Sequence, residues 1–149
     1  MLVINDIIKK LPYEDPFLFV DRINMVSDNA IEGCYTFKKE EFFYKGHFKG
    51  QPVTPGVILT ECCAQIGLVC LGIHLLNTEE VETAGYQVAL SGSEMQFMLP
   101  VLPLEMVTVK SNMLFFRFNK LKCEVKMYNR QAQLVCKGVL SGMIRNTNT

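Results

Sequence analysis

Hydrophobic and polar residues alternate over much of the chain, which is typical of β-strands with one buried face. The alternation is clearest at 121–128, where Leu121, Cys123, Val125 and Met127 are separated by polar residues. It also runs through 29–38, and the turn Ser27-Asp28-Asn29 predicts a hairpin with a strand over 17–26. Further strands are predicted over 86–90, 94–99, 106–118 and 133–144.

A different pattern covers residues 57–76, which are apolar on nearly every side. The segment is about as long as a bilayer requires. Because it contains Glu61, Gln65 and His74, we interpret it as a buried core helix rather than a membrane span. Thr54 is the predicted N-cap, with Pro55 at the first helical position. Residues 2–10 predict a short amphipathic helix that ends before Pro12.

These elements indicate an α+β fold, with one long helix packed on a curled antiparallel sheet of about six strands. The 149 residues suit a single domain over 1–149. The net charge of zero argues against a nucleic-acid partner. No pair among the six cysteines has CxxC spacing, so we expect reduced, buried thiols. The first residues do not resemble a signal peptide, and we therefore expect a cytoplasmic protein.

Two residues between 43 and 65 could carry chemistry. His47 lies between Gly46 and Phe48 in a loop, and Glu61 lies among apolar residues of the predicted helix. Burial raises the pKa of a carboxyl group, so a neutral His beside a protonated Glu supplies a base and an acid. The first backbone N–H groups of the helix, at Gly56 and Val57, could polarise a carbonyl oxygen.

The residues alone leave this interpretation open. A single loop histidine is more often structural than catalytic, and Glu61 could simply be hydrogen-bonded to Gln65 one turn later. His74 is interpreted as a packed structural residue. Asp21 and Arg22 are expected to make an ion pair or a contact at a strand end.

The amino-acid sequence of the whole segment favours a catalytic interpretation. GHFKGQPVTPGVILTECCAQ, residues 46–65, resembles the active-site motif GHFPGxPxxPGVLxxExxAQ of the FabZ-type β-hydroxyacyl-acyl carrier protein dehydratases. Upstream, LPYEDPFLFVDRI is similar to the LPHRxPFLxVDR opening of that family. The resemblance implies a hotdog fold, in which an antiparallel sheet wraps around a long helix.

The resemblance also implies the roles of individual residues. His47 would remove the C2 proton, Glu61 would protonate the leaving C3 hydroxyl, and the Gly56 N–H would hold the thioester carbonyl. Gln65 would orient Glu61, while Val57 and Phe48 would contact the substrate. The family forms dimers whose sites combine His47 of one chain with Glu61 of the other, and often hexamers. We expect neither a metal nor a cofactor.

The chain departs from the family pattern in three places. Lys49 replaces a proline, LPYE replaces LPHR, and 94–105 lacks the arginines that the family uses to dock an acidic carrier protein. The carrier could therefore be acyl carrier protein or coenzyme A, with Lys45 and Lys49 as substitute docking cations. An apolar wall, interpreted mainly as core packing, takes the place of the arginines: Met95, Phe97, Met98 and Leu99.

The expected activity is dehydration of 3-hydroxyacyl thioesters to trans-2-enoyl thioesters. A hotdog thioesterase is the first alternative, but such enzymes usually need one carboxylate and no histidine at this position. A non-catalytic acyl-binding subunit is the second, and the presence of both His47 and Glu61 argues against it. The related FabA-type dehydratases, which also isomerise the double bond, carry an aspartate at the position of Glu61, so the resemblance implies dehydration alone.

Overall fold

The computed structural model describes residues 4–78 and 86–146. It has a six-stranded antiparallel sheet in the order β1-β2-β4-β5-β6-β3. The helical elements are α1 (Ile4–Lys9), the 3-10 turn η1 (Phe42–Lys45), α2 (Gly56–Ala64), the π-helical turn η2 (Gln65–Cys70) and α3 (Leu71–Thr78). The strands are β1 (Arg22–Val26), β2 (Ala30–Thr36), β3 (Tyr86–Phe97), β4 (Met106–Arg117), β5 (Lys120–Tyr128) and β6 (Leu134–Asn146).

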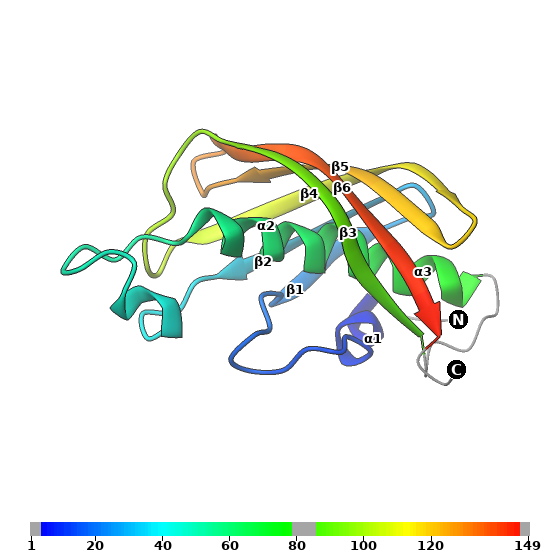
Figure 1. The fold of residues 1–149 in the computed structure, drawn as a ribbon, viewed down its shortest axis with the longest axis horizontal. Coiled ribbons are helices and arrows are strands. Elements are labelled where there is room, and N and C mark those ends of the chain that lie inside the picture. Colours follow the sequence, from blue (N-terminus) through cyan, green and yellow to red (C-terminus); the bar gives the residue numbers. More distant parts are fainter. Residues whose placement is uncertain (1–3, 79–85, 147–149) are drawn as a thin grey trace.

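The sheet curls around one long helix, as expected for a hotdog fold (Figure 1). This helix runs through α2, η2 and α3 from Gly56 to Asn77, and most of its apolar surface is buried inside the protein. Although the helix is long and apolar enough to cross a membrane, this burial identifies it as a core helix. The α+β prediction and the interpretation of the apolar segment are confirmed.

Strand β5 shows why the alternation was informative. Its four apolar residues at odd positions are fully buried, whereas Glu124 and Lys126 face solvent. Side chains of successive strand residues point to opposite faces, so one face packs on the helix and the other carries charge. All six cysteines are free and buried, which confirms the prediction of reduced thiols.

Several predicted boundaries were wrong. The strand predicted over 17–26 begins only at Arg22, because the backbone around Phe17 and Phe19 binds the side chain of Gln65 instead of a neighbouring strand. The segments 86–90 and 94–97 belong to one continuous strand, β3, which ends at Phe97 rather than Leu99 and has an irregular register between Leu90 and Gly92. An apolar-polar pattern shifts at such an irregularity, and the single strand therefore looked like two.

The π-helical turn η2 was not predicted. It lies where the long helix packs closely on β4: a Cβ atom at Gly67 would come within 2.9 Å of Ser111. The Ser111 hydroxyl donates a 2.8 Å hydrogen bond to the Gly67 carbonyl. This bond gives the Gly67 carbonyl a hydrogen-bond donor where the helix changes from α-helical to π-helical hydrogen bonding.

Gly138 on β6 provides a test of how closely the strands approach each other. A Cβ atom there would lie 2.0 Å from the backbone oxygen of Glu94 on β3. We expect Gly138→Ala to lower the free energy of unfolding by about 2 kcal/mol or more, since the two strands would have to separate. Gly92→Ala is the control, because its Cβ would meet only Ser141, at 3.8 Å. Equal stability of the two variants in denaturant titrations would contradict the prediction.

Candidate active site

His47 follows the turn η1 and is held by the loop around it. Its backbone N–H donates to the Phe43 carbonyl at 3.2 Å, and its ring stacks on Phe48 with the ring centroids 4.0 Å apart. The His47 Nδ1 lies 2.9 Å from the Val53 carbonyl oxygen. A carbonyl can only accept, so Nδ1 carries the proton and Nε2 keeps a free lone pair when the ring is neutral. The loop therefore presents His47 as a base.

The start of α2 follows this loop but is not capped as predicted. Thr54 makes no capping bond, because its hydroxyl pairs with the Tyr44 hydroxyl at 2.6 Å. Its backbone N–H instead donates to the Val101 carbonyl at 2.8 Å. The helix begins at Gly56, one residue later than expected, with Pro55 as the flanking residue. The Gly56 and Val57 N–H groups have no partner within the helix and can bind an incoming oxygen.

Glu61 is partly buried on the long helix. Burial raises the pKa of its carboxyl group above the ordinary value, although a hydrogen bond from Gln65 opposes this. The Gln65 Nε2 donates to Glu61 Oε2 at 3.0 Å. The raised pKa favours the protonated carboxylic acid at a higher pH than usual. Glu61 thus has the environment of a proton donor.

Gln65 is fully buried and links three elements. The Gln65 Nε2 also donates to the Phe17 carbonyl at 3.0 Å, and Oε1 accepts from the Phe19 N–H at 2.8 Å. With the bond to Glu61, both amide protons and the amide oxygen are used. The amide therefore fixes the extended segment before β1 against the helix and holds Glu61 at the same time.

Tyr13 is a neighbour of Glu61 that the sequence analysis noted only as a departure from the family motif. Burial and, secondarily, the charge of Glu61 raise the pKa of Tyr13 to about 12. Its ring lies 6.4 Å from that of Phe17, in the segment that Gln65 holds. The sequence did contain a signal for Tyr13, because the family motif LPHR has a polar side chain at the position that follows Leu-Pro.

A cavity of about 280 Å³ opens beside the helix start, lined by Gly56, Leu59 and the end of β3. A Cβ on Gly56 would lie 3.3–3.4 Å from the Phe97 ring, so the glycine lets this ring pack tightly over the helix start. Of the predicted apolar wall, Met95 and Leu99 pack on the core. Phe97 and Met98 are 49% and 43% exposed and line the cavity, which core packing does not explain.

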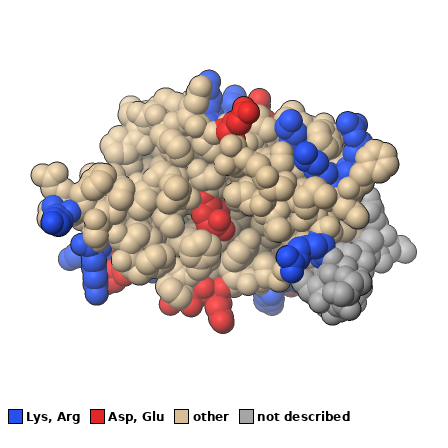
Figure 2. Space-filling view, in the orientation of Figure 1, with Lys and Arg blue, Asp and Glu red and all other residues tan. Residues whose placement is uncertain are grey.

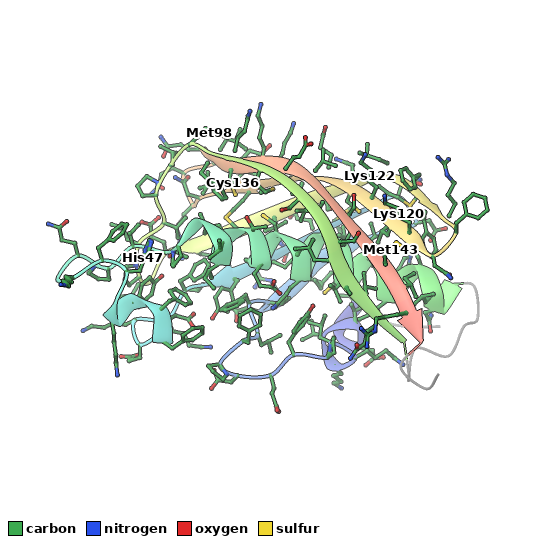
Figure 3. All side chains as sticks on the ribbon, in the orientation of Figure 1. His47, Met98, Lys120, Lys122, Cys136 and Met143 are labelled. Carbon is green, nitrogen blue, oxygen red and sulfur yellow. The ribbon has the colours of Figure 1, made fainter. Side chains whose placement is uncertain are left out.

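No hydrogen bond joins His47 to Glu61 in the described chain, since each has the separate partners given above. His47 lies at the end of the molecule where the long helix begins (Figure 3). Phe48, its neighbour in sequence, and Val57 in the first turn of the helix are exposed. The structure thus brings Gly56, Val57 and the cavity together at the helix start, and Glu61 with Gln65 further along. Lys45 and Lys49 are exposed beside His47.

The remaining polar residues singled out in the sequence have structural partners. The His74 Nε2 lies 3.0 Å from Asp28 Oδ1, which attaches the helix to the β1–β2 turn. Asp21 accepts a hydrogen bond from the Thr36 N–H at 2.8 Å, and Arg22 donates to Asn24 at 2.9 Å. Asp21 therefore makes a contact at a strand end, which was one of the two expectations; the other was an ion pair with Arg22.

Comparison with known proteins agrees with this geometry. Residues 11–140 match the FabA-like domain family. The chain is 30% identical to the 3-hydroxyacyl-[acyl-carrier-protein] dehydratase FabZ of Ehrlichia canis, over 95% of each chain. It is 36% identical to the protein of the same name from Geobacter metallireducens, over 72% of this chain and 70% of that one.

Solved structures confirm the fold. The dehydratase heterocomplex ApeI:P from Xenorhabdus doucetiae superposes with a TM-score of 0.77 at 16% identity, covering 95% of this chain and 92% of that one. A hypothetical thioesterase from Streptococcus pneumoniae, solved with coenzyme A, has a TM-score of 0.63 at 14% identity. Its coverage is 84% of this chain and 85% of that chain. At such identities the likeness concerns the fold only.

The raised pKa of Glu61 predicts a pH-dependent cost to stability. The folded state retains the Glu61 proton to a higher pH than the unfolded chain does, so stability falls as the pH rises from the unfolded pKa to the folded one. Glu61→Gln removes this titration, and we expect the variant to melt above the wild type at about pH 8 but not at about pH 4. A melting-temperature difference that is the same at both values would contradict the assignment.

Proposed function

Because the chain belongs to the FabA-like family, we propose that it dehydrates 3-hydroxyacyl thioesters to trans-2-enoyl thioesters in fatty-acid or related lipid or polyene synthesis. The observation that carries the proposal is that the chain holds one proton acceptor and one proton donor, each fixed by its own hydrogen-bond partner. His47 is held with Nε2 free to accept a proton, and Glu61 is held with a raised pKa that favours a proton to donate. Elimination of water needs both.

Each group performs one part of the elimination. The thioester carbonyl binds at the Gly56 N–H, where the helix dipole stabilises enolate character. His47 Nε2 takes the C2 proton, the C2–H electron pair forms the C2–C3 double bond, and the C3–O bond breaks. Glu61 supplies its proton to the departing hydroxyl, which leaves as water. His47 then releases its proton and Glu61 regains one, so the enzyme is restored.

A second copy of the chain completes this site in our proposal. Strand β3 ends the sheet order, and its outer edge has no partner strand among the described residues. It is twelve residues long and carries exposed Leu90 and Phe97, and such an edge favours pairing with another strand. Pairing of two β3 edges would join two sheets and set His47 of one copy against Glu61 of the other. A trimer of such dimers would be a hexamer.

The substrate contacts follow from the walls of the cavity. Phe97 and Met98 offer an apolar surface beside Gly56 for the acyl chain or the thioester arm, with Val57 and Phe48 exposed beside the helix start. Acyl carrier protein and coenzyme A both present such a thioester, and Lys45 and Lys49 are exposed for an acidic carrier. The six free thiols fit a reducing compartment, so we place the enzyme in the cytoplasm.

Thioester hydrolysis is the competing activity, because a carboxylate such as that of Glu61 could activate water for attack on the thioester. The raised pKa of Glu61 favours the role of proton donor over that of general base. Hydrolysis by Glu61 would also leave His47 without a function. Dehydration uses both residues: the free Nε2 of His47 as the proton acceptor and the carboxyl of Glu61, whose pKa is raised, as the proton donor.

The direct test offers 3-hydroxyacyl and enoyl thioesters of several chain lengths on acyl carrier protein and on coenzyme A. We expect enoyl absorbance to change without release of free thiol. His47→Ala and Glu61→Gln should each lower turnover about 100-fold or more, because each removes one proton transfer. His74→Ala is the matched histidine control and should retain turnover. Free thiol without an enoyl signal would favour the thioesterase, and near-wild-type rates in either variant would refute the mechanism.

Mixing the two inactive variants tests whether the site lies between two copies. After denaturation and joint refolding, half of the dimers contain one chain of each kind, and each such dimer has one intact site. We expect recovery of about a quarter of wild-type turnover, as two-fold symmetry requires. If each site were formed within one chain, the mixture would remain inactive. His47→Ala taken alone through the same denaturation and refolding is the control and should remain inactive.

A further inference from the structure

A second surface lies at the end of the sheet away from His47, at the turn between β4 and β5 (Figure 3). Phe118 forms the tip of this turn and is 90% exposed. Phe118 and Asn119 both have positive φ angles, of 53° and 61°. Gly, Asn or Asp are usual in such a turn, and a bulky aromatic residue there is unfavourable. Neither packing nor turn geometry therefore explains Phe118.

Other apolar and basic side chains surround this tip. Leu114, at an irregularity of β4, is 52% exposed, and Met143 on β6 is 40% exposed. Lys120 lies between Arg117 and Met143 in the register of the three strands, and Lys122 is two residues further on the same face. We call this surface the basic hairpin end; its members are Leu114, Arg117, Phe118, Lys120, Lys122 and Met143.

The positive charge of the basic hairpin end is not neutralised within the described chain. Arg117 and Lys120 are direct cross-strand neighbours, an arrangement that like charges make unfavourable. None of its three cations has an ion pair among the described residues. β4 and β6 contain no acidic residue, and β5 contains only Glu124. Figure 2 shows Lys and Arg side chains gathered at the upper right of the molecule.

We propose that the basic hairpin end docks on an anionic lipid surface. Phe118 and Leu114 would enter the interfacial region, where aromatic and apolar side chains are favoured, and Arg117, Lys120 and Lys122 would lie against lipid phosphates. The core helix takes no part in this contact. His47 lies at the opposite end of the molecule, so docking leaves the candidate active site open (Figure 3).

The shape and the charge of the surface favour lipid over a second copy of the chain. Its apolar part is a projecting turn with a few side chains, whereas a stable protein interface buries about 800 Å² on each partner. A two-fold interface would also set the same cations against each other. An anionic bilayer accepts a projecting aromatic tip and attracts every cation around it.

The test is sedimentation of the full chain with phosphatidylcholine vesicles, with and without phosphatidylglycerol. We expect binding only to the anionic vesicles, and its loss at high salt. Lys120→Gln combined with Lys122→Gln should lower the partition coefficient about 25-fold, at roughly fivefold for each cation. Phe118→Ser should lower it about tenfold, because the inserted side chain is lost.

Matched controls carry the same changes elsewhere. Lys126→Gln with Lys137→Gln removes two cations from the same face of the sheet, and Phe42→Ser removes another exposed aromatic residue. Both controls should bind nearly as the wild type does, and all variants should keep their turnover of soluble thioesters without vesicles. Equal losses in the controls, or a wild type that stays in the supernatant, would overturn the proposal. A smaller particle mass for Phe118→Ser would overturn it too, because the turn would then contact another copy.

Discussion

The structure depends on the enclosure of a helix that is apolar on nearly every side. Such a helix cannot lie on a surface with one face in water, so the sheet has to curl around it and the segment before β1 has to cover what remains. Gln65 is a fully buried polar residue of that helix. A fully buried amide must find partners for both its protons and its oxygen, and its partners here are the covering segment and Glu61.

The same amide connects folding to chemistry. The segment around Phe17 and Phe19 reads as a strand in sequence, yet its backbone groups bind Gln65 rather than a strand. The geometry of Glu61 therefore depends on how a distant part of the chain packs. The packing of this segment also keeps Glu61 partly buried, and burial raises the pKa of its carboxyl group.

Much of the fold and the candidate site could be predicted because the relevant signals are local. The alternation in β5 reports one buried face, and the apolar run at 57–76 reports a buried helix. The Thr54 cap was mispredicted because Tyr44 competes for the Thr54 hydroxyl, which is a tertiary contact. The π-helical turn likewise arises from the approach of Gly67 to Ser111 on a strand 44 residues away. The roles of His47 and Glu61 came from the family resemblance, since either residue alone has a structural explanation.

The groups proposed for the chemistry and the surface proposed for substrate contact belong to different parts of the chain. His47 and Glu61 are held by a loop carbonyl and by a helix side chain, whereas Phe97 and Met98 come from the end of β3. Substitutions at the end of β3 can therefore reshape the cavity without disturbing the bonds that hold the base or the acid. Divergence between paralogues would accordingly accumulate on that strand end, and a lineage could acquire a new acyl preference while inheriting its reaction unchanged.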